Sequence, residues 1–412
     1  MGKQNDRTVV GTGQGMGRGI SRRTFGKLAG GAAVIGGATL GSPFIISARG
    51  EETIKLGGIF HMTGAGSIWG PSMQQCMELA VNQINAAGGV LGRQLEMVSE
   101  DDATSTDVGV QKATKLIQAD GCKALMGVVY SSVRAAIAEN AAARFKVPYF
   151  YPTYWESKTS CGRYFISMGA LPNQQLDFFI PYLIESFGKR IYCVGQDYIW
   201  PRVSIEYIKG IAAQSGGEVV GEEYVPFDQS DWSSIINRVK DSGPDVFFPF
   251  IGGSGLISCL KQYYDFGMGD TKVAATLMDE LYTPAFEPEL RKGMQCSVSY
   301  LMELDNPVNK AFVAAFKQAY GENAILNNMG EGQYDSVYIW KAAVEKAGTF
   351  DIEKTVDALG GISFNAPQGE ISIDGATNHA ALHQIIAEVR ADGGFNIIKD
   401  FGKVAAITDC RV

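Results

Sequence analysis

Histidine is scarce in this chain, which has only three in 412 residues: His61, His379 and His383. A metal centre built on histidine needs several of them close together, so the composition does not indicate one. The sequence also lacks a Walker phosphate loop, an H-E-x-x-H zinc motif and the G-x-S-x-G turn that presents a nucleophilic serine. We therefore expect no metal and no cofactor, and the common hydrolase signatures are missing.

An excess of positive charge is missing as well. The chain has 36 Lys and Arg against 44 Asp and Glu. Residues 1–48 hold six of the 36 basic residues and one of the 44 acidic ones, so the remainder carries a formal charge of −13. Such an acidic protein is repelled by nucleic acids and by anionic membrane surfaces, and we expect neither as a partner.

Two adjacent arginines, Arg22 and Arg23, precede an uncharged segment of mostly Gly, Ala, Val, Ile and Leu at residues 28–46. This order is typical of a twin-arginine export signal, and the small residues before Arg49 suggest cleavage near Ala48. The alternative is a transmembrane anchor, but five glycines, a proline and a serine dilute the segment. We expect residues 1–48 to engage the twin-arginine export machinery and the mature protein to be periplasmic.

The seven cysteines show no C-x-x-C spacing: Cys76, Cys122, Cys161, Cys193, Cys259, Cys296 and Cys410. An odd number leaves at least one thiol free. Because twin-arginine substrates fold before export, in a reducing compartment, we expect buried free thiols, with a Cys122–Cys161 bridge as the alternative.

Strand-length apolar runs alternate with segments of helical period. The expected strands are residues 54–60, 94–99, 123–130, 147–151, 190–195, 218–224 and 245–250, and the expected helices are 72–87, 108–118, 132–145, 202–213, 232–239 and 256–264. Alternation of this kind predicts a doubly wound α/β fold with mainly parallel sheets covered by helices on both faces. Ligands in such folds bind beyond the carboxyl ends of the strands.

About 360 residues follow the predicted signal, more than one core usually holds, so two lobes are expected. The pattern changes after residue 300 to helices at 309–320 and 334–346 and short strands at 371–373 and 383–389. We assign residues 53–171 and 304–361 to an N-terminal lobe, and 172–303 and 362–412 to a C-terminal lobe. Several short crossovers between them would form the hinge.

Hydroxyl groups follow two of the expected strands. Ser131 and Ser132 end the strand at 123–130 and open the next helix, so a serine hydroxyl can face the cleft together with free backbone N–H groups. Ser132 can equally be a plain helix cap. Tyr151 and Thr153 follow the strand at 147–151 and offer hydroxyls for a polar ligand.

Aromatic residues stand at three further loop positions. Tyr154 extends the cluster after residue 151, although it can also pack against the hinge. Tyr198 follows a strand of the second lobe and can close onto a ligand from the opposite side. Trp69, in the first strand-to-helix loop, can form a lid or pack on its own turn.

Asp279 and Glu280 follow an apolar run at residues 273–277. If a carboxylate here faces the cleft, it can accept N–H bonds from an amide, urea or ammonium group. The alternative is a solvated loop charge or a helix cap.

The chain resembles the periplasmic solute-binding proteins of ATP-driven uptake systems, of the leucine/isoleucine/valine-binding type, over residues 53–398. The resemblance rests on INAAGGVLGR at residues 84–93, SSVR at 131–134 and YPT at 151–153. PNQQ at 172–175, DYIWPR at 197–202 and PQG at 367–369 are most similar to the urea and short-chain amide branch.

This resemblance implies two Rossmann-like lobes joined by three crossovers, a type I periplasmic binding protein, which close on a small polar ligand for delivery to a membrane permease. It implies that Ser131, Tyr151, Thr153 and Tyr198 hydrogen-bond the amide or urea and that Trp69 is an aromatic lid. The chain departs from the branch pattern at Val129, Trp155 and Asp279.

Three functions follow from this pattern. The first is a non-enzymatic receptor for urea, a short amide or a related nitrogen compound, with an amino-acid or amine ligand as the alternative. The second is a ligand sensor or regulator of the same fold, which the export signal opposes. The third is an amide-hydrolysing enzyme, but Ser131 has no obvious histidine partner in the sequence.

Overall fold

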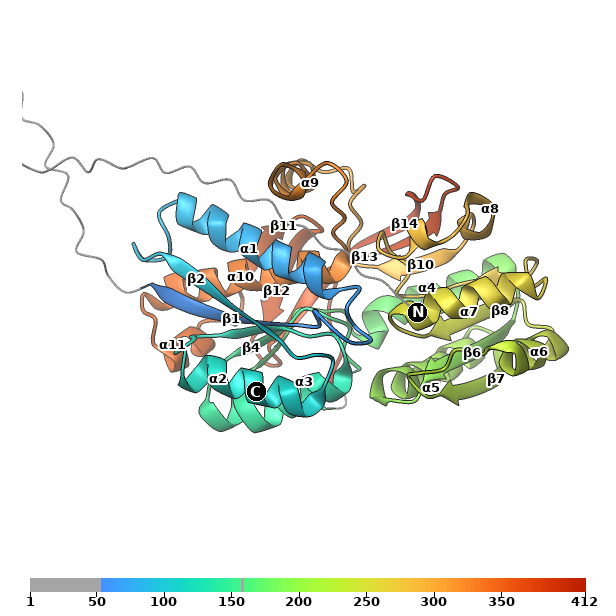
Figure 1. Cartoon of the computed structure of the whole chain (residues 1–412), viewed down its shortest axis with the longest axis horizontal. Helices are drawn as coiled ribbons and strands as arrows, with labels where there is room; N and C mark the ends of the chain where they lie inside the picture. The colour runs from blue at the N-terminus through green and yellow to red at the C-terminus, as the bar shows by residue number, and fades with distance from the viewer. Residues whose placement is uncertain (1–52, 157–158) are drawn as a thin grey trace, which may run out of the picture. The chain divides into compact units, whose positions relative to one another are not determined.

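The computed structural model describes residues 53–156 and 159–412, and Figure 1 shows its helices and strands in chain order. The predicted signal at residues 1–48 lies outside the described residues. Within the described part, no helix has both the length and the apolar character that crossing a membrane requires.

The first sheet gathers strands from both ends of the described chain. Its order is β2-β1-β3-β4-β5-β13-β12-β11. The strands from β2 to β13 run parallel, and β12 and β11 are antiparallel additions at the edge. Their bounds are β1 Ile54–Phe60, β2 Leu95–Asp101, β3 Leu125–Gly127, β4 Tyr149–Tyr151, β5 Phe165–Ser167, β11 Ser363–Ala366, β12 Gly369–Asp374 and β13 His379–Val389.

The second sheet has the order β7-β6-β8-β9, and all its pairs are parallel. A bridge between Ala274 and Gln295 continues it to β10, which pairs with the second half of β13, and β14 pairs with β13 on the other side. The bounds are β6 Arg190–Gln196, β7 Glu218–Val225, β8 Val246–Phe250, β9 Lys272–Val273, β10 Gln295–Val298 and β14 Phe395–Val404.

Helices cover both faces of each sheet. In the first lobe, α1 and α10 pack together on one face, and α2 and α3 pack together on the other (Figure 1). In the second lobe α4 packs on α5, and α6 on α7. The α-helices are α1 Gly70–Ala86, α2 Thr106–Gln118, α3 Ser131–Ile137, α4 Pro172–Phe187, α5 Ile199–Gln214, α6 Ser233–Ser242, α7 Ser254–Asp265, α8 Pro288–Arg291, α9 Pro307–Tyr320, α10 Asn328–Ala347 and α11 Ile352–Asp357. A π-helix at Ala138–Ala143 continues α3, and a 3-10 turn spans Thr283–Ala285.

The α/β fold class predicted from the sequence is confirmed, but three segments differ in detail. The strand expected at 123–130 ends at Gly127, and of the run at 273–277 only Val273 lies in a strand, β9 at Lys272–Val273. Residues 362–381 were assigned to the second lobe, whereas β11 and β12 pair within the first sheet. The reason is that β13 spans both lobes, so its first residues carry β12 into the first sheet.

A buried carboxyl pair lies beside this hinge strand. Glu331 and Asp335 on α10 are both fully buried, and the Gln368 amide donates to Glu331 Oε2 at 2.9 Å and to Asp335 Oδ2 at 3.2 Å. The side-chain amide oxygen of Gln368, Oε1, accepts the backbone N–H of His383 in β13 at 3.1 Å. Burial raises the pKa of Glu331, and burial together with the Glu331 charge raises the pKa of Asp335.

The cysteine pattern corrects one expectation. Cys161 and Cys410 form a disulfide, with their Cα atoms 5.4 Å apart, and Cys122 is a buried free thiol. The alternative Cys122–Cys161 bridge is therefore wrong, because the chain end returns to the loop before β5. The other five cysteines of the described residues are free and buried, as expected.

We predict that the buried carboxyls make the protein less stable as pH rises. A carboxyl whose pKa is raised by folding contributes its stability below its unfolded pKa, and loses it as pH rises through the folded value. The free energy of unfolding should fall from pH 5 to pH 8 by up to about 1.4 kcal/mol per pH unit for each proton lost. Thermal unfolding at several pH values measures this.

Glu331→Gln should make this decline shallower, because the amide does not ionise. Glu345→Gln on the same helix is the control, since Glu345 is exposed and pairs with Lys341. If the free energy of unfolding falls with pH equally steeply in the parent and in Glu331→Gln, the raised pKa of Glu331 is contradicted.

We predict that the disulfide stabilises the fold by about 2–4 kcal/mol. The bridge joins residues 249 positions apart, so its loss enlarges the freedom of the unfolded chain. Dithiothreitol should lower the thermal midpoint of the parent, and Cys161→Ser should lower it equally. In the Cys161→Ser protein, dithiothreitol should not lower the midpoint further. A midpoint in that variant equal to that of the parent would refute the prediction.

Candidate functional site

The chain leaves strand β3 through a short strained segment, residues 127–130. Gly127 has φ +121° and Val128 has φ +58°, a conformation that a β-branched residue rarely adopts. A Cβ on Gly127 would lie 2.1 Å from the Ile59 carbonyl oxygen, so only glycine fits there. The segment turns away from the sheet and carries Val129, Tyr130 and Ser131 to the end of the first lobe.

Side chains satisfy the backbone carbonyls of this segment. Tyr149 donates its hydroxyl to the Gly127 carbonyl at 3.1 Å, Thr153 to that of Val128 at 3.0 Å, and Tyr151 to that of Val129 at 2.5 Å. All three donors are buried, and burial raises the pKa of Tyr151. The hydroxyls of Tyr151 and Thr153, predicted to bind a ligand, thus hold the segment that borders the site.

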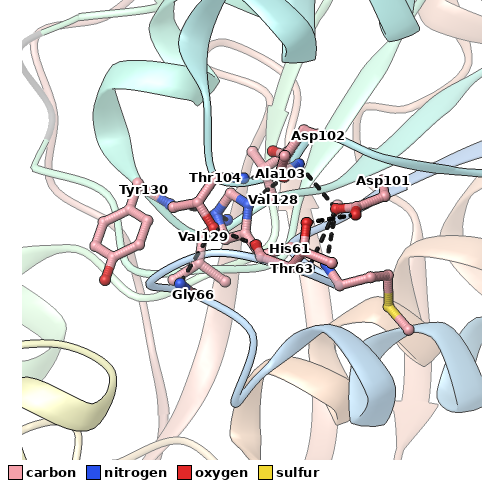
Figure 2. Close-up of polar contacts among 12 residues, drawn as sticks. His61, Thr63, Gly66, Asp101, Asp102, Ala103, Thr104, Val128, Val129 and Tyr130 are labelled. Carbon is pink, nitrogen blue, oxygen red and sulfur yellow. Dashed lines mark hydrogen bonds and ion pairs between the residues drawn. The ribbon is translucent and has the colours of Figure 1, made fainter.

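An imidazole satisfies the N–H groups. His61 Nε2 lies 3.0 Å from the Val129 nitrogen and 3.2 Å from the Tyr130 nitrogen, and its Nδ1 lies 2.6 Å from Asp102 Oδ1. Figure 2 shows the imidazole between the Asp102 carboxylate and the two backbone N–H groups. Both side chains of this hydrogen-bonded pair are fully buried.

Behind the segment lies a buried ion pair. Arg134 on α3 donates to both carboxylate oxygens of Glu156, at 2.5 and 3.0 Å. The Ser131 hydroxyl donates to Glu156 Oε2 at 3.2 Å. Because the carboxylate only accepts, the lone pairs of the Ser131 oxygen remain available for a ligand donor.

Ser131 borders a small cavity, of about 10 Å³, that both lobes line. Its walls are mostly aromatic and aliphatic, and the hydroxyl groups come from one serine, one threonine and two tyrosines. The lining residues are Trp69, Val129, Ser131, Thr153, Tyr154, Tyr198, Trp200, Leu277 and Met329.

The two lobes touch around this cavity. The Tyr154 hydroxyl donates to the Thr276 carbonyl of the second lobe at 2.8 Å. Trp69 packs edge-on against Tyr282, with ring centres 6.4 Å apart, and Tyr130 packs against Tyr198 at 5.7 Å. These contacts describe a closed arrangement of the lobes.

Five of the nine predicted residues lie together at this cavity: Trp69, Ser131, Thr153, Tyr154 and Tyr198. Ser132 is exposed on α3 and lies outside the lining. Tyr151 is buried behind the segment that it holds. Direct contact of any of the nine with a ligand stays a prediction.

The two predicted carboxylates lie near the cavity but outside its lining. Asp279 is buried and accepts from the Asn327 amide at 2.9 Å and from the Leu281 N–H at 3.0 Å; burial raises its pKa to about 7. Glu280 accepts the Met302 N–H at 2.5 Å, pointing toward the chain that leads to α9. Asp279 therefore links the second lobe to the start of α10.

Four lining residues were not predicted: Val129, Trp200, Leu277 and Met329. Leu277 is the last residue of the apolar run at 273–277, just before the predicted Asp279 and Glu280. Trp200 lies two positions after the predicted Tyr198. Both stand close to the end of an expected strand, and that position is a signal from which they could have been predicted. Met329 comes from α10, far along the chain, and no local signal marks it.

The geometry gives Ser131 no histidine partner. The Nε2 of His61 already faces two backbone N–H groups, and Ser131 donates to Glu156. A nucleophilic serine needs a base that accepts its proton within hydrogen-bond reach. In addition, the described residues contain no group of three or more His, Cys, Asp or Glu side chains able to hold a metal ion.

We predict that Tyr151→Phe lowers the free energy of unfolding by about 1–3 kcal/mol, because it leaves the buried Val129 carbonyl unsatisfied. Thermal unfolding of the purified variant measures the loss. Tyr164→Phe is the matched control, because the Tyr164 hydroxyl binds Glu353 in an exposed position. Equal stability of the two variants would show that the Val129 bond contributes little.

Comparison with known proteins places the chain in a family. Residues 53–394 match the periplasmic binding protein family. The chain is 25% identical to Leu/Ile/Val-binding protein homolog 6 of Brucella melitensis, over 84% of this chain and 90% of the relative. It is 27% identical to the leucine-, isoleucine-, valine-, threonine- and alanine-binding protein of Pseudomonas aeruginosa, over 78% and 86%.

A solved structure agrees with this match. The solute-binding protein of an ABC transporter from Rhodopseudomonas palustris BisB5, in complex with 3,4-dihydroxybenzoic acid, superposes with a TM-score of 0.77. It is 25% identical and covers 87% of this chain and 99% of its own. The chain belongs to the periplasmic binding protein family, with the type I fold of the Leu/Ile/Val-binding proteins.

Proposed function

We propose that this protein is the extracytoplasmic receptor of an ABC transporter, which closes its two lobes on a small polar nitrogen compound and delivers it to a membrane permease. The observation that carries the proposal is the cavity between the lobes, lined by Ser131 and Thr153 from one side and by Tyr198 and Trp200 from the other. A ligand there contacts both lobes and so favours the closed form.

The hydrogen-bond directions support urea or a short-chain amide as the ligand. The hydroxyls of Ser131 and Thr153 donate to Glu156 and to the Val128 carbonyl, which leaves two oxygens facing the cavity as acceptors for N–H groups. The indole N–H of Trp69 is buried and has no hydrogen-bond partner among the described residues. It is a donor for a carbonyl oxygen, so the cavity offers the complement of an amide.

A second candidate is an amino acid with an apolar side chain, and the aliphatic lining favours it. Val129, Leu277 and Met329 add apolar surface that urea alone does not use. The Pseudomonas aeruginosa relative is named for binding leucine, isoleucine, valine, threonine and alanine. An amide with a short alkyl chain shares this need for apolar contact, so both candidates belong in one screen.

The same geometry supports binding without turnover. The relatives named above are binding proteins, and the carboxylate that Ser131 reaches, Glu156, is already paired with the Arg134 guanidinium, which makes it a weak base. The predicted twin-arginine signal supports export to the periplasm as a folded protein and opposes a role as a cytoplasmic sensor.

We predict that urea or a short amide raises the thermal midpoint of residues 49–412 after unfolding and refolding to remove bound ligand. At about 100 times its dissociation constant, a ligand adds roughly 2.7 kcal/mol and shifts the midpoint by a few degrees. Differential scanning fluorimetry with urea, acetamide, propionamide, L-isoleucine, small amines and 3,4-dihydroxybenzoate measures the shift. A response to isoleucine alone would select the second candidate.

Ser131→Ala should weaken the binding of the active compound by about 1–3 kcal/mol, since it removes a buried acceptor. Ser132→Ala is the matched control, because Ser132 is the exposed neighbour. If every compound leaves the midpoint unchanged, the ligand class is wrong; if both serine variants bind alike, the site is wrong.

A further inference from the structure

We propose that His61 is a positioning residue for ligand capture, because its Nε2 atom is the hydrogen-bond acceptor that holds two backbone N–H groups at the wall of the cavity. The effect on ligand binding rests on the proposed function, whereas the effect on the backbone does not.

The Asp102 carboxylate fixes the tautomer of the imidazole. Asp102 Oδ1 lies 2.6 Å from His61 Nδ1 and also accepts the Thr104 N–H at 3.0 Å. An ionised carboxylate only accepts hydrogen bonds, so Nδ1 carries the proton and Nε2 keeps its lone pair. That lone pair meets the N–H groups of Val129 and Tyr130 (Figure 2).

Those two N–H groups belong to residues that shape the cavity and the closed form. Val129 lines the cavity, as does Ser131, the residue after Tyr130. The Tyr130 ring packs against Trp69, Tyr198 and the half-exposed Phe227, with centres 5.8, 5.7 and 5.2 Å apart. One acceptor atom thus positions three consecutive residues that face the ligand or the opposite lobe.

Backbone strain makes the acceptor necessary. Gly127 and Val128 turn the chain out of the sheet, so the next two N–H groups find no neighbouring strand. A buried N–H without a partner costs about as much as a lost hydrogen bond, and here two would be orphaned together.

The groups that face the imidazole leave Nε2 to the two backbone N–H groups. Asp102 lies on the Nδ1 side, and the Tyr130 ring packs beside the imidazole with ring centres 5.4 Å apart. Asp101, the last residue of β2, binds the Thr63 hydroxyl and the Met62 N–H instead. A side chain without an acceptor at the Nε2 position should therefore release the segment and weaken ligand capture.

The experiment compares the parent with His61→Gln and His61→Leu at neutral pH. Glutamine carries a carbonyl oxygen near the Nε2 position that accepts N–H bonds, whereas leucine carries no acceptor. His383→Gln is the matched control, because His383 is a second histidine that lies away from the cavity. Its Nε2 atom is 2.8 Å from Asp400 Oδ1. Two measurements are made: propionamide affinity by tryptophan fluorescence, and hydrogen exchange of the Val129 and Tyr130 amides by NMR.

In His61→Leu, protection of the two amides and propionamide affinity should each fall roughly tenfold or more relative to the parent. His61→Gln should keep both values, and His383→Gln should behave as the parent. Should the leucine variant not fold, the glutamine variant decides alone, because it keeps only the acceptor.

Full amide protection in His61→Leu, or loss of amide protection in His61→Gln, would overturn the proposal. If propionamide fails to bind the parent while the amides respond as expected, the ligand class is wrong and the role of His61 in holding the segment stands.

Discussion

The closed site depends on one constraint: a buried stretch of backbone that has left its sheet must still find a partner for every N–H and carbonyl. Residues 127–130 meet this constraint with side chains from three directions. Tyr149, Tyr151 and Thr153 donate to the carbonyls, and His61 accepts from the N–H groups. The segment is consequently rigid at the place where the ligand is expected, and a preformed wall lowers the entropy lost on binding.

This arrangement separates residues that shape the site from residues that face it. Tyr151 and Ser131 come from neighbouring strand ends and carry the same kind of group, yet only Ser131 reaches the cavity. A hydroxyl that donates to a fixed carbonyl or carboxylate turns its lone pairs elsewhere, so the supporting network also sets the polarity of the wall. The ion pair of Arg134 with Glu156 acts in this way through Ser131.

The sequence predicted the fold well because alternation of apolar runs with helical periods is a local signal. It predicted the strand ends at which Trp69, Ser131, Thr153 and Tyr198 meet, since parallel strands present their carboxyl ends at one edge. It did not predict β13 as a strand shared by both lobes, the Cys161–Cys410 bridge, or Met329 in the cavity. Each of these joins segments far apart in the chain, and hydrophobic periodicity carries no information on such pairs. The same limit applies to His61, whose partners lie 41 and 68 residues away.

Electrostatics around the cavity favour a solute without net charge. The nearest full charges are already compensated: Arg134 is paired with Glu156, and Asp102 with the imidazole N–H. Asp279 is buried, and a pKa of about 7 makes the neutral acid a substantial part of its population at neutral pH. An ion that entered this apolar cavity would lose its hydration without gaining an opposite charge, a cost of several kcal/mol, whereas an amide loses only hydrogen bonds that the wall can replace. A zwitterionic amino acid falls between these cases, because its ammonium and its carboxylate each need polar groups nearby. In the described lining the hydroxyl side chains lie on the first lobe, apart from the Tyr198 phenol on the second.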